Sequence, residues 1–175
     1  MNLWLRLTRV ILASLVRPRL AMVDGSGLTF RVWPTDLDFN LHMTNARYLA
    51  LMDLGRMDLI LRTGLWRTIV RHKWAPVIGG TVVRYRRPLH PFQRVRLTSR
   101  MLTWDDKWIY IEHRLESGGR LACQAVVRSA FVGPDGTVPP PAVADAVGHD
   151  GAAPALPTWV ATWKGMDDSL GRFVS

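Results

Sequence analysis

The sequence PTDLDFNLHMTNARYL, residues 34–49, passes from a polar loop into the start of a helix. Its first half is rich in Pro, Asp and Asn, which favour turns because Asp and Asn side chains bond to nearby backbone groups. Its second half opens a run that ends at Arg62, with Asn45 as a good N-cap and Gly64 as a good stop. We therefore predict a polar loop followed by one long helix.

The predicted helix is apolar around most of its circumference. Its large apolar side chains are Tyr48, Leu49, Leu51, Met52, Leu54, Met57, Leu59, Ile60 and Leu61. A helix of this kind is buried on most of its sides, so we expect the rest of the chain to enclose it. Gly55 within the helix either lets a ligand reach the backbone or permits tight packing against a sheet.

Strands are predicted before and after this helix. Residues 28–33 alternate as a short strand, and a second short helix is expected over about 65–72. Four later runs alternate with a period of two residues: Val77–Arg87, Arg94–Trp104, Lys107–Ser117 and Arg120–Val132. The links between the runs, Pro88–Gln93, Asp105-Asp106 and Gly118-Gly119, are short enough for hairpins. The four runs therefore predict an antiparallel meander.

Residues 1–20 predict an amphipathic helix in which Arg6, Arg9 and Arg17 share one narrow stripe. This helix is too short to span a membrane, because a span needs about 20 apolar residues. It also lacks the uncharged cleavage site of a secretory signal. Two alternatives remain for residues 1–17. They pack onto the domain or its dimer mate, or they lie on an anionic membrane with the arginines on its phosphates.

The composition fits one globular domain, with 175 residues, 48% hydrophobic and 21% charged. The lone cysteine, Cys123, forms neither an internal disulfide nor a cysteine zinc cluster, which favours the cytoplasm. The formal net charge of +9 favours an anionic partner. We expect no nucleic-acid partner, because charge alone supports one and no such binding motif is present. The Pro-, Ala- and Gly-rich composition of residues 133–175 predicts a linker and a tail.

Asp36, Asp38, Asn40 and His42 occupy alternate positions just before the predicted helix. If the loop is extended, their side chains lean to the same side. The start of a helix also offers free backbone N–H groups. An acid, an amide and an imidazole beside such donors suit acyl-transfer hydrolysis. The side chains activate water or attack a carbonyl, and the N–H groups stabilise the oxyanion.

The run from Asp36 to Asn45, followed by Tyr48, resembles the loop and helix start of hotdog-fold thioesterases. It is most similar to the 4-hydroxybenzoyl-CoA thioesterase-like and acyl-ACP thioesterase group. The run VRYRRPL, residues 83–89, also resembles that group's strand with a Tyr-x-x-Pro-Leu ending. The resemblance covers about residues 27–132. It implies an α+β hotdog fold, an antiparallel sheet wrapped around one long central helix, here with an extra N-terminal amphipathic helix.

The resemblance implies a thioesterase that hydrolyses an acyl-CoA or acyl-ACP to a carboxylic acid and a free thiol. It places the catalytic carboxylate at Asp38, as general base or nucleophile, with Asn40 and His42 as the other catalytic residues. The acyl-ACP enzymes also have a Glu or Cys on a later segment. Because no Glu lies between Asp58 and Glu112, the helper group stays open. No metal or other cofactor is implied.

For substrate binding we expect Asn45, Tyr48, Arg84, Arg86 and Arg87, since guanidinium groups bind the phosphates of coenzyme A in a bidentate manner. The family usually builds its sites at a dimer interface, which implies a homodimer or a dimer of dimers. The expected location is the cytoplasm, at the inner face of a membrane if the N-terminal helix lies on lipid.

Two alternatives keep the same fold. A hotdog hydratase or dehydratase resembles an Asp-x-Asn-Pro-x-His arrangement, whereas His42 here follows Asn40 by two positions without the proline. A non-catalytic acyl-CoA-binding module would not need Asp38, Asn40 and His42, which are all present. Among the remaining candidates, Cys123 is expected to be a buried, inert thiol. His90 is expected at the surface.

Overall fold

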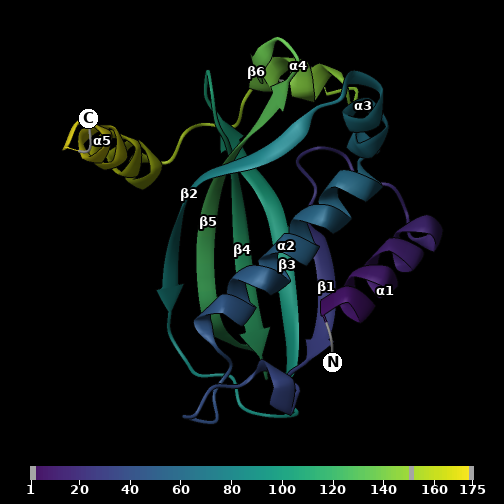
Figure 1. Ribbon diagram of the computed structural model, residues 1–175, viewed down its shortest axis with the longest axis vertical. Helices are drawn as coiled ribbons and strands as arrows, with labels where there is room; N and C mark the ends of the chain where they lie inside the picture. Colours follow the sequence, from purple (N-terminus) through teal and green to yellow (C-terminus); the bar gives the residue numbers. More distant parts are fainter. Residues whose placement is uncertain (1–2, 150–151, 174–175) are drawn as a thin grey trace.

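The computed structural model describes residues 3–149 and 152–173. A curled antiparallel sheet wraps around helix α2 (Asn45–Arg62), and helix α1 (Leu3–Val16) packs beside α2 (Figure 1). The sheet contains β1 (Ser26–Arg31), β2 (Ala75–Tyr85), β3 (Arg94–Trp104), β4 (Ile109–Ser117), β5 (Arg120–Gly133) and β6 (Gly136–Val138). The other helices are a 3-10 turn (Pro34–Asp36), α3 (Leu65–His72), α4 (Pro140–Asp145) and α5 (Thr158–Phe173). The predicted sheet around one long helix is confirmed.

The strand order corrects the prediction of one continuous meander. The order is β1-β3-β4-β5-β2, so β2 pairs with β5 and forms an edge of the sheet. Val83 of β2 lies opposite Ala125, and Leu28 of β1 lies opposite Leu97 of β3. The link over residues 88–93 therefore passes from the edge strand β2 to β3, which lies between β1 and β4, and it is not a hairpin. Apolar alternation decides which face of a strand is buried, but it does not decide which strand lies next to it.

Helix α2 begins and ends almost where the sequence predicts. Its N-cap is Thr44 rather than Asn45, because the Thr44 hydroxyl accepts a 3.1 Å hydrogen bond from the Arg47 N–H. Gly64 follows the last turn with a φ of +83°, which suits a glycine. A β-carbon on Gly55 would clash with the hydroxyl of Ser99 on β3. The glycine thus serves tight packing of α2 against the sheet.

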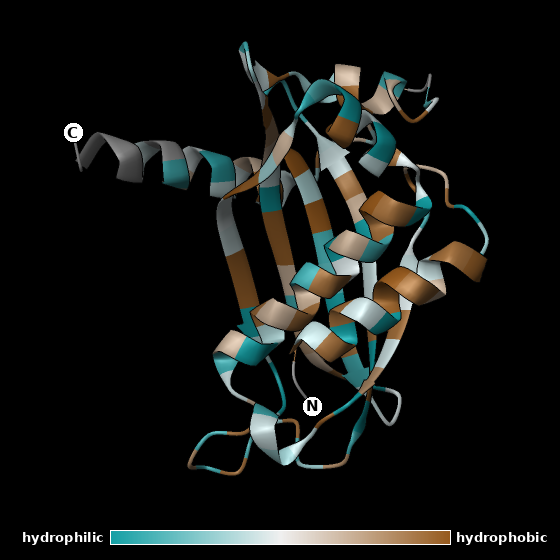
Figure 2. Cartoon of the chain, turned by 45° about the vertical axis from the view of Figure 1, so that its right-hand side comes forward, coloured by the Kyte–Doolittle hydropathy of each residue, from teal (hydrophilic) through white to brown (hydrophobic). Residues whose placement is uncertain are grey.

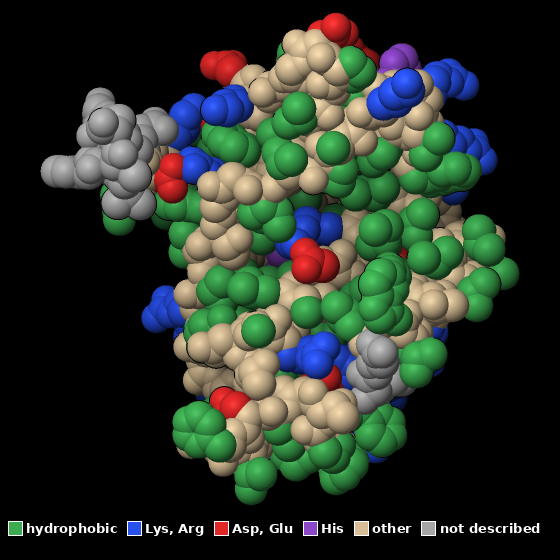
Figure 3. Space-filling model, in the orientation of Figure 1, with side chains coloured by type: hydrophobic (Ala, Val, Ile, Leu, Met, Phe, Trp, Pro, Cys, Tyr) green, Lys and Arg blue, Asp and Glu red, His purple; other side chains and the backbone are tan. Residues whose placement is uncertain are grey.

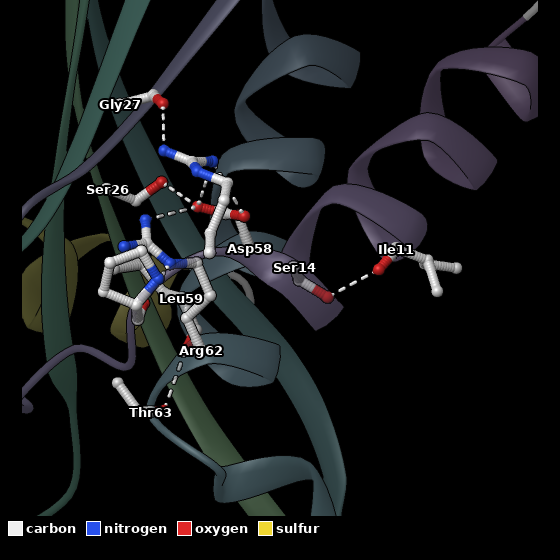
Figure 4. Close-up of polar contacts among 10 residues, drawn as sticks. Ile11, Ser14, Ser26, Gly27, Asp58, Leu59, Arg62 and Thr63 are labelled. Atoms are coloured by element: carbon white, nitrogen blue, oxygen red, sulfur yellow. Dashed lines mark hydrogen bonds and ion pairs between the residues drawn. The ribbon is translucent and has the colours of Figure 1, made fainter.

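Helix α1 is attached to the domain by its arginine stripe. The Arg6 side chain is 1% exposed, and it donates to both carboxylate oxygens of Asp36 at 3.1 and 2.5 Å. At the other end of α1, Arg17 reaches the Asp58 carboxylate at 3.3 Å. Asp58 also accepts the Ser26 hydroxyl at 2.5 Å, and Figure 4 shows this carboxylate at the centre of its polar contacts. Helix α1 therefore packs onto the domain, which is the first of the two alternatives predicted for it.

Helix α1 is apolar on more than one side: Leu3, Leu7 and Val10 pack on the core, and other apolar side chains face outward. Figure 2 shows hydrophobic residues along the length of α1, and Figure 3 shows hydrophobic side chains at the surface on this side of the molecule. Exposed fractions of 60% to 86% are found for Trp4, Leu5, Leu12, Leu15 and Val16. The expectation that Arg6 and Arg17 meet lipid phosphates is wrong, because both bond to buried carboxylates instead. No helix within the described residues is long and apolar enough to cross a membrane.

The C-terminal part has more structure than the predicted linker. Residues 133–149 include β6 and α4, whose Val143 is buried. Pro140 is the first residue of α4, a position where proline starts a helix well. The described side chains of α5 attach it to the sheet through buried Val160 and through Lys164, which bonds to Asp105 at 2.8 Å. The Pro-rich composition therefore marks helix starts as well as connections.

Replacing Arg6 by methionine tests the attachment of α1. The Arg6→Met variant should lose about 3 kcal/mol of unfolding free energy, because it removes one partner of a buried ion pair. Denaturant unfolding followed by tryptophan fluorescence measures this difference. Arg9→Met on the same helix is the control, since Arg9 is exposed and forms no ion pair within the described residues. An equal loss in both variants would show that the Asp36 pair does not hold α1.

Candidate active site

The loop before α2 holds Asp38 at a tight turn. The Asp38 N–H donates to the His42 carbonyl at 2.9 Å, and the Leu41 N–H donates to the Asp38 carbonyl at 3.0 Å. One carboxylate oxygen, Oδ1, accepts the Asn40 N–H at 2.8 Å. The other oxygen, Oδ2, has no hydrogen-bond partner among the described residues. Asp38 is only half-buried, so this oxygen is available to a ligand.

The loop is not extended, which corrects the expectation that four alternating side chains lean to one side. A 3-10 turn ends at Asp36, and Leu41 adopts a positive φ of +59°. Asp36 is buried, and it accepts the Trp33 N–H at 2.9 Å and pairs with Arg47 at 2.9 Å in addition to Arg6. Asp36 therefore holds the loop in place, whereas Asp38 faces outward from it.

His42 and Asn40 take different positions around Asp38. The His42 ring is half-buried and packs edge-on against the His90 ring, with 4.8 Å between the ring centres. Asn40 is exposed, and its backbone rather than its side chain bonds to Asp38. The exposed position expected for His90 is confirmed, although its contact with His42 joins it to the site.

The first turn of α2 lies directly after this loop. The N–H groups of Asn45 and Ala46 donate no hydrogen bond within the described residues, as expected at the start of a helix. Tyr48 is buried one turn later, and burial is the main cause that raises its pKa to about 12. Its ring packs edge-on against Tyr85 at the end of β2, 5.2 Å between centres. Asn45 thus offers a free donor, while Tyr48 connects α2 to β2.

The three arginines expected to bind substrate lie together at the end of β2. Arg84, Arg86 and Arg87 line one shallow groove with Arg120 and the apolar side chains of Tyr85 and Leu121. None of the four arginines forms an ion pair with a described residue. The Met43 N–H bonds to the Leu89 carbonyl at 2.9 Å, which ties the next segment of the chain to the Asp38 loop. Arg120 was not predicted, because its strand partner becomes known only with the β2–β5 pairing.

An apolar cavity of about 330 Å³ lies farther along α2, between this helix and strands β2, β4 and β5. Its walls include Met57, Ile78 and Ile111, but also the charged pair of Asp53 and Arg56. This pair does not stand out in the sequence pattern. The signal available was an arginine next to Gly55 in a helix that is otherwise mostly apolar.

His113 lies behind Arg56 and is fully buried. Burial, and secondarily the charge of Arg56, lowers the pKa of His113 to about 3, so its ring is neutral at physiological pH. Cys123 is also fully buried, and burial raises the pKa of its thiol to about 12. The prediction of an inert thiol is confirmed. Within the described residues, no group of three or more His, Cys, Asp or Glu side chains could hold a metal ion.

A family model described as "Thioesterase-like superfamily" matches residues 32–163. The chain belongs to this superfamily. A curated relative is "Protein THEM6" of Danio rerio, 38% identical over 116 residues, which are 66% of this chain and 55% of the relative. The chain spans between 40% and 55% of the length of the first curated relatives it matches.

Solved structures of hotdog thioesterases share this fold. YbaW, a probable thioesterase from Escherichia coli, has a TM-score of 0.65 at 18% identity, over 69% of this chain and 94% of YbaW. A mutant of 4-hydroxybenzoyl CoA thioesterase complexed with 4-hydroxybenzoyl CoA has a TM-score of 0.64 at 17% identity, over 70% of this chain and 97% of that protein. The predicted hotdog fold is thereby confirmed. Helix α1 lies before the residues that the family model matches.

Proposed function

We propose that this protein is an acyl-CoA thioesterase, which hydrolyses a thioester to a carboxylic acid and free coenzyme A. The observation that carries the proposal is the half-buried Asp38 carboxylate on a tight turn of the loop that leads into α2, whose first two N–H groups have no partner among the described residues. Membership of the thioesterase-like superfamily supports it. A carboxylate that activates water or attacks the carbonyl, and N–H donors that stabilise the oxyanion, are sufficient for one route of thioester hydrolysis.

Asp38 acts on the thioester carbonyl in one of two ways. It takes a proton from a water molecule whose oxygen attacks the carbonyl carbon, or it attacks that carbon itself and water then hydrolyses the anhydride. In both cases the N–H groups of Asn45 and Ala46 stabilise the oxyanion. The thiolate then leaves and takes up a proton. We assign His42 and Asn40 to orienting the water and the substrate carbonyl.

The groove formed by Arg84, Arg86, Arg87 and Arg120 is proposed to bind the phosphates of coenzyme A. Four guanidinium groups that have no carboxylate partner among the described residues create a strongly positive surface, and guanidinium groups bind phosphate in a bidentate manner. Tyr48, in the first turns of α2 after the Asp38 loop, connects this groove to the candidate active site, because its hydroxyl lies 3.5 Å from the Arg87 carbonyl. Phosphates held there leave the pantetheine arm within reach of the start of α2.

A homodimer is proposed to form along β2. This strand is an edge of the sheet, and its side chains Val77, Ile78, Val82 and Tyr85 are 39% to 54% exposed. An exposed apolar edge strand is a template for pairing with another strand, so a second copy would cover it. Light scattering of the full chain distinguishes a dimer or a dimer of dimers from the 19.8 kDa monomer.

The outer face of α1 is proposed to lie on an anionic membrane surface, at the inner face of a membrane in the cytoplasm. Exposed Trp4 and Leu12 supply the apolar contact, and the nearby Arg9, Arg19 and Arg31 are exposed cations. Residues 1–35 contain five arginines but only one acidic residue outside the buried core, Asp24. Apolar groups combined with cations fit anionic lipid.

The Asp38→Asn variant tests the proposed chemistry. Loss of one activating carboxylate should lower kcat for acyl-CoA hydrolysis by about two orders of magnitude. Folding should be unaffected, because Asn keeps an oxygen for the Asn40 N–H. Release of free thiol from a panel of acyl- and aryl-CoAs measures turnover. A variant that keeps wild-type turnover would show that Asp38 is a turn residue alone.

Replacing Arg86 and Arg120 together by alanine tests the proposed phosphate groove. The KM for an acyl-CoA should rise about tenfold or more, since each lost charge-assisted hydrogen bond to phosphate contributes about 1.5–3 kcal/mol to binding. The KM for the matching acyl-N-acetylcysteamine, which has no phosphate, should stay the same. An equal rise of KM for both substrates would show that the phosphates of coenzyme A do not bind in this groove. Arg114→Ala, on the exposed pair with Glu116, is the control.

Vesicle sedimentation tests the membrane contact. The full chain should sediment with vesicles that contain phosphatidylserine but not with pure phosphatidylcholine vesicles, and salt should weaken the binding. Leu12→Glu should stay in the supernatant. Val70→Glu is the matched control, because Val70 of α3 is 70% exposed but lies outside α1. If Leu12→Glu instead halves the mass in light scattering without changing sedimentation, α1 contacts a second copy and not lipid.

A further inference from the structure

One pair of charged side chains, Arg56 and Asp53, lies in the wall of the otherwise apolar cavity along α2. The Arg56 side chain is only 13% exposed, and its guanidinium group pairs with Asp53, which is 59% exposed. Figure 3 shows a basic and an acidic side chain together in a hollow framed by hydrophobic side chains. Burying an arginine against apolar walls is unfavourable unless its donors are used. A ligand that accepts hydrogen bonds from Arg56 would therefore be bound favourably in this cavity.

Arg56 is held in this position from behind by a buried relay. Its Nη1 lies 3.3 Å from Nε2 of His113, and Nδ1 of His113 lies 2.8 Å from the Ser99 hydroxyl. Because a guanidinium group only donates hydrogen bonds, Nε2 must accept and Nδ1 must carry the ring proton. His113 and Ser99 are both fully buried. Gly55 is needed for this relay, since any side chain there would displace Ser99.

Arg56 lines the cavity and has N–H donors without a partner among the described residues. A guanidinium group has five N–H bonds, and Arg56 uses one toward His113 and one toward Asp53 in the described structure. The two other polar side chains of the cavity wall are already engaged. Thr63 donates to the Leu59 carbonyl at 2.8 Å, and Ser129 donates to the Ile109 carbonyl at 3.4 Å. Arg56 and Asp53 are therefore the side chains of the cavity wall that together offer a polar ligand a charged donor and a charged acceptor.

We propose that Arg56 and Asp53 select an acyl chain that carries a hydroxyl group. The hydroxyl oxygen accepts a hydrogen bond from Arg56, and its proton is donated to the Asp53 carboxylate. The remaining carbons of the chain lie against the apolar walls. This inference rests on the proposed thioesterase function and names the acyl group that the function acts on.

The chemistry of the pair distinguishes a hydroxyl from other oxygen groups. A keto oxygen accepts from Arg56 but offers no proton to Asp53, and a carboxylate is repelled by Asp53. Arg56 follows Asn45 by eleven residues, which is about 16 Å along a helix that rises 1.5 Å per residue. The hydroxyl group is therefore placed near the far end of a medium-length chain, and not beside the thioester held at the start of α2.

The test compares dodecanoyl-CoA with omega-hydroxydodecanoyl-CoA and the CoA thioester of dodecanedioic acid. The wild-type chain should hydrolyse the hydroxylated substrate with a kcat/KM about ten- to one-hundred-fold above that of the plain chain, the range of one or two hydrogen bonds to charged groups. The dicarboxylic thioester should not share this preference. In Arg56→Met the ratio of hydroxylated to plain substrate should fall to about one.

Two further variants keep the result interpretable. Asp53→Asn, at an exposed position, should reduce the ratio without unfolding the chain, and Arg114→Met is the matched arginine control that should retain it. Binding of free omega-hydroxydodecanoic acid, measured by tryptophan fluorescence against dodecanoic acid, repeats the comparison without catalysis. Failure of the wild type on every thioester would refute the proposed function, even with selective fatty-acid binding. Hydrolysis of all three thioesters with no hydroxyl preference would overturn the present inference alone.

Discussion

The buried carboxylate of Asp36 joins four parts of the chain. It bonds to Arg6 of α1, to the Trp33 backbone after β1, and to Arg47 in the first turn of α2, while belonging itself to the loop between them. A fully buried carboxylate is unfavourable unless its oxygens are satisfied, so these elements must be present together for any of them to be stable. The relative positions of α1, the loop and the start of α2 follow from this one group.

The same constraint separates the roles of two acidic residues that are two positions apart. Asp36 turns inward because its oxygens are fully used by arginines and backbone. The 3-10 turn that ends at Asp36 then reverses the chain, and Asp38 comes to lie half-buried at the next turn. A carboxylate with a free oxygen is therefore presented on a loop that is anchored two residues earlier. Positioning of a reactive group on a rigid support is what catalysis by orientation requires.

The sequence predicted what depends on local pattern and chemistry. The period of α2, the turn residues before it and the resemblance around Asp38 were enough for the hotdog fold and for the corner that contains Asp38, His42 and Asn45. The contacts that depend on long-range pairing were not predictable. The β2–β5 pairing brings Arg120 beside Arg84, and the burial of Asp36 is decided by Arg6, which is 30 residues earlier. A role for His113 was not predictable either, because its contact Arg56 is 57 residues away in the sequence.

The amphipathic helix at the N-terminus shows why a helical pattern alone does not decide which face is buried. Hydrophobic periodicity predicts that the apolar face of a helix packs on the domain. In α1 only part of the apolar surface does so, since Leu3, Leu7 and Val10 pack on the core while Trp4 and Leu12 stay exposed. The ion pairs of Arg6 and Arg17 with buried carboxylates fix which side of this largely apolar helix faces the domain. Arg6 also bonds to Asp36, the residue that holds the Asp38 loop in place. A surface that binds the exposed apolar side chains of α1 is therefore connected to the candidate active site through the Arg6–Asp36 ion pair.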